Sequence, residues 1–327
     1  MVHLQDEPIA DPVCVPIYYL SKLARDKGIV VCQVGEGADE LYWGYGSWKV
    51  KLRLQQVDNW PVPSFIKKLD MLALKATGQS HTLGYVFLRR GSIGQPVFWG
   101  GAEGFTETEK KWLLSPKLRE KFKDYSSWDA LRPIHDRFLA KAWEKSTLNW
   151  MTYLDLNFRL PELLLMRVDK MSMGVGLEGR VPFLDHKFVE LAMSIPSEMK
   201  TRGGISKYIL KKAVRGVIPD RIIDRKKQGF GVPVYDFLPG QLGERMHAEL
   251  REFCEQSGLL DWKHAQEFLK PDRGSPQKGW YLFNLALWWK HFIVGDGTLA
   301  DSDWVVPPKY YARKPQSSST ALEADHA

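Results

Sequence analysis

Three acidic residues lie within a short segment that also contains two glycines, residues 34–40 with the sequence VGEGADE. Glycine lets a backbone approach a bound ligand closely, and carboxylates can hold Mg²⁺ or act as a general base. Alternatively, Asp39 and Glu40 only complement the dipole of a helix that begins near Ala38, which is worth about 0.3 to 1 kcal/mol each. That alternative leaves Glu36 unexplained. The segment therefore indicates a ligand-binding loop with Glu36 and Asp39 as its candidate functional residues and Glu40 as a weaker candidate.

The residues before this loop predict the elements that position it. Residues 13–27 carry apolar side chains at helical spacing, and Gly28 stands where a helix usually ends. The β-branched run 29–34 follows between two glycines, which is typical of a buried strand. A helix, a strand and a glycine loop in this order indicate an α/β fold, in which ligands bind at the carboxyl ends of parallel strands.

Further helices are predicted in the second half of the chain. Residues 146–160 predict a helix that ends at Pro161, and this proline begins another helix that runs to about residue 175. Asp185 is predicted to cap the helix that follows it, and Ser206 to cap the next one.

The chain divides into three parts on these patterns. Residues 1–240 contain the candidate site, residues 241–300 predict amphipathic helices of the same domain, and residues 301–327 predict a disordered tail because they are rich in proline, serine and charge. No chemistry can be assigned to residues 50–145.

Composition excludes several classes of protein. The chain has 327 residues, of which 44% are hydrophobic, and its net charge is +7. This charge could suggest a polyanionic partner, but the basic residues are dispersed and no nucleic-acid-binding motif is present. A nucleotide polyphosphate is enough to account for an anionic partner. No apolar run reaches about 18 residues, which argues against membrane insertion. The three cysteines, Cys14, Cys32 and Cys254, lack metal-ligand spacing and suggest free thiols in the cytoplasm.

Four groups of segments together resemble the synthetase domain of asparagine synthetases that take their nitrogen from glutamine. The resemblance extends from about residue 4 to about residue 240 and is loose over residues 50–145. Many members of that family have serine where this chain has Val34. The matching segments are DEPIADP at 6–12, VGEGADELYWGY at 34–45, RVDKMSM at 167–173 with EGRVPFLD at 178–185, and SKYIL at 206–210 with RKKQGFGVP at 225–233.

This resemblance implies a fold and a reaction. The fold is a partial doubly wound parallel sheet of the adenine nucleotide α hydrolase-like, PP-loop type, followed by a mostly helical C-terminal part. The reaction is that of an ATP-dependent ligase. A carboxylate of aspartate attacks the α-phosphorus of MgATP to give an acyl-adenylate and pyrophosphate, and ammonia derived from glutamine then attacks the activated carbonyl.

The resemblance also implies roles for individual residues. Lys207 matches the family's catalytic lysine and would stabilise charge on phosphate, and Glu36 would take a proton from ammonia as general base. Asp39 would help to hold Mg²⁺. The loop residues 34–37, Val34, Gly35, Glu36 and Gly37, would lie against ATP.

Two features of the family are missing from this sequence. There is no glutaminase domain with an N-terminal cysteine, and no SGG-x-D-S loop to hold the pyrophosphate of ATP. We therefore expect a fragment that binds ATP weakly and depends on a glutaminase domain or subunit for ammonia. We also expect an exposed sheet edge through which the chain self-associates.

Several alternatives remain open at this stage. The acceptor is aspartate by default, but relatives of this domain also amidate sugars or peptides, and the chain could instead be a non-catalytic remnant or interaction subunit. Lys207 could be an exposed solubilising lysine, and residues 225–227 a solvated loop rather than a phosphate contact. Arg180 could bind a substrate carboxylate, although an internal salt bridge to Glu178 or Asp185 is favoured.

Overall fold

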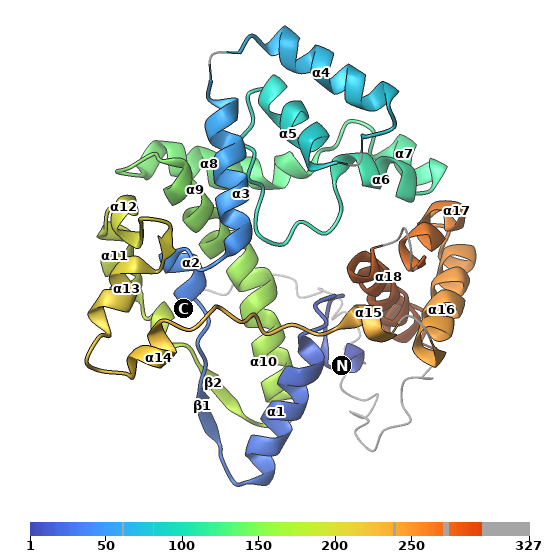
Figure 1. The fold of residues 1–327 in the computed structure, drawn as a ribbon. Helices are drawn as coiled ribbons and strands as arrows, with labels where there is room; N and C mark the ends of the chain where they lie inside the picture. Colours follow the sequence, from blue (N-terminus) through green and yellow to red (C-terminus); the bar gives the residue numbers. More distant parts are fainter. Residues whose placement is uncertain (61, 81, 238–239, 271–274, 296–327) are drawn as a thin grey trace, which may run out of the picture.

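A computed structural model describes residues 1–295, except for residues 61, 81, 238–239 and 271–274 (Figure 1). The predicted tail, residues 301–327, lies outside the described residues. The chain is mostly helical. It has a small parallel sheet, of which one strand precedes the central helices in the sequence and the other follows them. Within the described residues, no helix combines the length and the apolar character needed to cross a membrane.

The parallel sheet consists of β1 (Val31–Gln33) and β2 (Glu178–Arg180), with Cys32 opposite Gly179. The Val34 amide donates to the Arg180 carbonyl at 2.7 Å, so the ladder continues into the loop. The predicted helix before β1 is confirmed as α1 (Cys14–Asp26), which packs against α10 beside the sheet (Figure 1). The predicted α/β character of this region is therefore confirmed.

The prediction that this strand is buried is wrong. Ile29, Val30 and Val31 are 47%, 57% and 40% exposed. In the part of the chain that the structure describes, β1 pairs with β2 alone, so its other edge has no strand to cover it. The β-branched pattern thus identified the strand correctly but not its surroundings.

Helices make up most of the rest of the described chain (Figure 1). After the site loop they are α2 (Ala38–Tyr42), α3 (Gly46–Asp58), α4 (Ser64–Ala76), α5 (Leu83–Ser92), α6 (Glu107–Leu113), α7 (Pro116–Lys121), α8 (Ser127–Lys141), α9 (Thr147–Leu154), α10 (Met166–Met173), α11 (His186–Ser194), α12 (Ser197–Lys200), α13 (Tyr208–Ala213), α14 (Asp220–Ile223), α15 (Val234–Phe237), α16 (Gln241–Ser257), α17 (Trp262–Ala265) and α18 (Pro276–Trp289). Short 3₁₀ turns lie at Val2–Leu4, Pro182–Leu184 and Gln266–Leu269, and a π-helical end at Lys290–Val294.

One predicted helix boundary is wrong. We expected one helix to end at Pro161 and another to begin there, but α9, a π-helix over Asp155–Leu165 and α10 form one continuous run. Proline cannot donate to the helical ladder, and its ring clashes with the carbonyl of the preceding turn. The wider π-helical turn accommodates Pro161 without ending the helix.

The two predicted helix caps have different outcomes. Asp185 caps α11 as predicted, because its side chain accepts hydrogen bonds from the amides of Lys187 at 3.0 Å and Phe188 at 3.3 Å. Ser206 does not cap α13, because it lies in β4 (Ile205–Ser206), which forms a hairpin with β3 (Thr201–Arg202). Lys207 occupies the cap position instead, in a left-handed conformation with φ of 57°.

Two apolar cores stabilise the helical layers. The first lies among α3, α8 and α9 and is aromatic, with Trp48, Phe98, Trp99, Trp128 and Trp150 all buried. The second joins α6, α16 and α18, and the helices α16, α17 and α18 lie within the range for which amphipathic helices are predicted. The segment to which no chemistry could be assigned, residues 50–145, forms α3 to α8 at the top of Figure 1.

Candidate active site

The loop after β1 is shaped by Gly37. This residue has φ of 94°, a conformation that L side chains rarely adopt, and it precedes the first residue of α2. A Cβ at this position would lie 2.4 Å from Cδ2 of Leu184. A Cβ added at Gly35 would have no atom within 4 Å. The loop is therefore tightly packed at Gly37 and open at Gly35.

Asp39 is held between two lysines from distant parts of the chain. Its Oδ1 lies 2.7 Å from Nζ of Lys207, and its Oδ2 lies 2.7 Å from Nζ of Lys227. Burial alone would raise the pKa of Asp39, but the two lysines more than offset it and the pKa is lowered. Asp39 therefore stays ionised and fixes both ammonium groups in one place.

Backbone geometry around this cluster leaves room for the ion pairs. The Lys207 amide donates to the carbonyl of Tyr42 at 3.0 Å, which ties the start of α13 to the end of α2. Gly44 passes so close that a Cβ there would lie 1.5 Å from Oδ1 of Asp39 and 2.5 Å from Cε of Lys207. Only glycine fits at position 44 without displacing the pair.

The cluster opens into a cavity of about 670 Å³ with a strongly basic lining. Asp39 is the only carboxylate among its lining residues. Such a concentration of cations in a concave site attracts polyanions. The basic residues are Lys49, Lys207, Lys211, Arg225, Lys226 and Lys227.

Glu36 is fixed by a different cation. Nη2 of Arg167, on α10, donates to Oε1 of Glu36 at 3.0 Å, and Nη1 lies 2.5 Å from Oδ2 of Asp11. Burial would lower the pKa of Arg167, but the two carboxylates raise it, so the guanidinium stays charged. The side chain of Glu36 is 19% exposed, which leaves one face of it accessible to a ligand.

Glu40, the third acid of the loop, points inward. It is 1% exposed, and its carboxylate accepts a hydrogen bond from the hydroxyl of Tyr45. Burial raises the pKa of Glu40 against the opposing effect of that bond. The ring of Tyr45 in turn lies 4.4 Å from the guanidinium of Arg159 and 5.4 Å from Nζ of Lys227. Glu40 thus fixes the hydroxyl of Tyr45, and the ring of Tyr45 contacts Lys227.

The arrangement can hold a metal ion only with help from a ligand. No group of three or more His, Cys, Asp or Glu side chains suitable for a metal occurs in the described ranges. Mg²⁺ is commonly held by one or two carboxylates together with substrate phosphates. Asp39, at the lining of a basic cavity, fits that type of site.

The structure brings Asp39 and Lys207 together, whereas Glu36 is held separately by Arg167. Asp39 and Lys207 form an ion pair, and within residues 225–227 the side chain of Lys227 completes the cluster. Arg180 lies 3.7 Å from Glu178, as the internal alternative predicts, although both side chains are largely exposed.

Sequence reasoning missed three residues. It gave no role to Arg167, Gly44 or Tyr45, although all three stand within the segments that resemble the family. An acid between glycines needs a cation to fix it, and this requirement could have pointed to Arg167 in RVDKMSM. Nothing local to the sequence indicates that Gly44 and Tyr45 make room for, and support, the lysines.

Comparisons with known proteins agree on one family. The family model described as asparagine synthase matches residues 1–291. Asparagine synthetase [glutamine-hydrolyzing] 1 of Bacillus subtilis is 35% identical over 76% of this chain and 37% of its own length. A putative asparagine synthetase [glutamine-hydrolyzing] of Mycobacterium bovis is 31% identical over 88% of this chain and 43% of its own length. An amidase, chyE, of Penicillium rubens is 24% identical over 76% of this chain and 39% of its own length. The chain thus spans about two fifths of the length of these relatives.

Proposed function

Since the chain belongs to the asparagine synthase family, we propose that it takes part in ATP-dependent formation of an amide from a carboxylate and ammonia. The observation that carries this proposal is the Asp39 cluster. Two lysines converge on one carboxylate in a basic cavity, and Glu36 stands three residues before that carboxylate.

In the first step, an oxygen of the acceptor carboxylate forms a bond to the α-phosphorus of ATP. The bond between the α-phosphorus and the bridging oxygen breaks, and pyrophosphate leaves. Negative charge on the phosphate oxygens would be stabilised by Lys207 and Lys227, already held in place by Asp39. Mg²⁺ bound to the polyphosphate would neutralise further charge, with Asp39 as its protein ligand.

In the second step, ammonia attacks the carbonyl carbon of the acyl-adenylate and AMP leaves. The nitrogen must lose a proton, and Glu36 is the proposed acceptor of it. Arg167 orients Glu36 by donating a hydrogen bond to its carboxylate. Residues 34–37 would lie against the nucleotide, with open space at Gly35. The relatives of Bacillus subtilis and Mycobacterium bovis are named as glutamine-hydrolyzing enzymes, so we propose that the ammonia derives from glutamine.

The two steps can be tested separately. Exchange of labelled pyrophosphate into ATP, dependent on an added carboxylate such as aspartate, reports the first step alone. Lys207→Met should lower this exchange about 100- to 1,000-fold, as expected for loss of an electrostatic contact to the transition state. Glu36→Gln should leave the exchange intact and lower amide formation from ammonia by about 100- to 10,000-fold.

Lys212→Met is the matched control, since Lys212 is an exposed lysine on α13 outside the lining of the basic cavity. It should exchange pyrophosphate like the wild type. If the wild-type chain exchanges pyrophosphate with no carboxylate at all, the catalytic proposal for this chain is wrong. If Glu36→Gln abolishes exchange, Glu36 is not the base of the second step.

A further inference from the structure

A second cavity, of about 460 Å³, is lined in part by Arg159, whose guanidinium lies over the same Tyr45 ring that Lys227 of the basic cavity approaches. We call it the aromatic pocket. Its volume is within the range of about 300 to 1,000 Å³ that is usual for small-molecule sites. The aromatic pocket is lined by Trp99, Phe105, Tyr125 and Phe158, and by the charged Arg159 and Glu162.

The aromatic pocket ends close to Glu36. Arg159 and Leu163 line it, and Arg167, which binds Glu36, follows at the same spacing on the same continuous helical run. Arg159 and Leu163 lie in the π-helical part of this run, and Arg167 lies in α10, four residues beyond Leu163. The Leu163 end of the pocket is therefore within about one helical turn of the residue that holds Glu36.

A tyrosine from α18 lies at the same junction. The ring of Tyr281 would lie 3.5 Å from a Cβ at Gly104, which also lines the aromatic pocket. Burial raises the pKa of Tyr281, and Asp11 and Arg159 are near enough for their charges to shift it in opposite directions. Tyr281 thus lies near both the aromatic pocket and Asp11, which shares Arg167 with Glu36.

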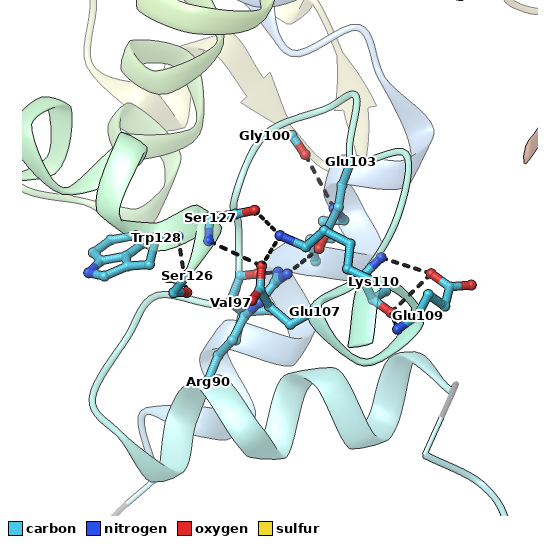
Figure 2. Close-up of polar contacts among 12 residues, drawn as sticks. Arg90, Val97, Gly100, Glu103, Glu107, Glu109, Lys110, Ser126, Ser127 and Trp128 are labelled. Atoms are coloured by element: carbon cyan, nitrogen blue, oxygen red, sulfur yellow. Dashed lines mark hydrogen bonds and ion pairs between the residues drawn. The ribbon is translucent and has the colours of Figure 1, made fainter. Parts of the chain in front are cut away.

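Most charges of the aromatic pocket are already paired. Glu103 is bound by Arg90, and Glu107 by Lys110 and by the amide of Ser127, as Figure 2 shows. Arg159 is paired with Asp155 at 3.2 Å.

Glu162 is different, since it is exposed and has no ion-pair partner among the residues that the structure describes. Its free carboxylate favours a cationic ligand group, and a second anion in the pocket would be repelled. The aromatic walls favour a ligand with an apolar or flat body.

We propose that the aromatic pocket holds the body of an acceptor larger than free aspartate, namely a carboxylate carried on a peptide-like chain with an amine that pairs with Glu162. This inference rests on the proposed function. The reacting carboxylate lies at Glu36, and the rest of the acceptor follows the helix past Leu163 toward Arg159. The walls of this pocket come largely from residues 99–131, which the family model covers but which lie outside the four groups of segments quoted for the resemblance.

The test measures binding to the chain by calorimetry with three probes: aspartate, aspartyl-lysine amide and aspartyl-glutamate amide. The lysine dipeptide should bind at least tenfold more tightly than either other probe. Glu162→Gln should reduce its preference over the glutamate dipeptide at least threefold. Equal affinities of the three probes, or no measurable binding of the lysine dipeptide, would overturn the proposal.

Two matched variants locate the binding. Ala130 and Ala140 are both exposed on α8, but Ala130 lines the aromatic pocket and Ala140 does not. Ala130→Trp should remove the advantage of the lysine dipeptide, and Ala140→Trp should retain it. If both variants retain it, the dipeptide binds elsewhere and the pocket has no such role.

Pyrophosphate exchange with each probe separates this inference from the proposed function. Exchange with aspartate but no preference for the lysine dipeptide refutes the acceptor pocket alone. Binding of the lysine dipeptide that Ala130→Trp blocks, without exchange by any probe, refutes the proposed function and with it the role of the ligand as acceptor. Faster exchange with the lysine dipeptide than with aspartate, lost in Ala130→Trp, supports both.

Discussion

Gly37→Ala should destabilise the chain through two separable effects. The residue has φ of 94°, and a side chain in the left-handed region costs about 1 to 2 kcal/mol. The new Cβ would also lie 2.4 Å from Cδ2 of Leu184, and overpacking of this kind costs about 1 to 3 kcal/mol. Replacing glycine restricts the unfolded chain, which returns about 0.4 to 1 kcal/mol. The net loss in the free energy of unfolding is therefore about 1 to 4 kcal/mol.

The two effects can be separated with a second substitution. In a Leu184→Ala background the contact is gone, so Gly37→Ala should cost only the backbone term, about 1 kcal/mol. Urea unfolding of the four proteins gives the coupling between the two positions directly. Gly35→Ala is the control, because no atom lies within 4 Å of its Cβ position and its φ is not left-handed.

Gly35→Ala should leave the free energy of unfolding unchanged or raise it by up to about 1 kcal/mol. If Gly37→Ala and Gly35→Ala have equal effects, the loop is not packed as described. If the cost of Gly37→Ala is the same with and without Leu184, the steric part of the reasoning is wrong.

Two further predictions concern an exposed residue beside β1 and a buried lysine outside that loop. Val30→Lys should reduce the self-association that we expect at the open edge of β1. Val217→Lys, at a residue that is 78% exposed elsewhere on the surface, is the control and should not reduce it. If light scattering over a concentration series gives equal masses for both variants, the edge contact is refuted. Lys200 is fully buried and has no hydrogen-bond partner among the described residues, and burial lowers its pKa to about 8. The unfolded chain keeps this proton up to a pH of about 10.4, so between pH 8 and 10.4 the unfolded state binds more protons than the folded state. Over this range the free energy of unfolding of the wild type should therefore rise by up to about 3 kcal/mol relative to that of Lys200→Met, as measured by urea unfolding. A comparison of wild type with the exposed-lysine control Lys187→Met should show no such change, and a flat profile for Lys200 would contradict its burial.

Local patterns predicted the elements around the site more accurately than their surroundings. Helical spacing and a glycine stop located α1, and the side chain of Asp185 capped α11 as expected, because both depend on residues close in sequence. Burial of the β1 strand was predicted wrongly, because burial depends on which strand lies beside it. Pro161 was read as a boundary because a π-helical turn leaves no signature in composition.

The candidate site shows the same limit. Residue types and family segments selected Glu36, Asp39 and Lys207, but the contact between Asp39 and Lys207 depends on two backbone features that no local pattern encodes. Lys207 must be left-handed so that its amide meets the end of α2, and position 44 must lack a Cβ so that the ion pair can form beside it. A lysine is an unusual residue for a left-handed position, which costs about 1 to 2 kcal/mol. That cost is compatible with folding only because the hydrogen bond to Tyr42 and the ion pair with Asp39 both fix the same residue. Lys207 thus keeps a strained backbone conformation at the lining of a basic cavity, and strain of this kind is concentrated at functional sites. This gives a structural reason, independent of the family resemblance, to assign Lys207 a functional role.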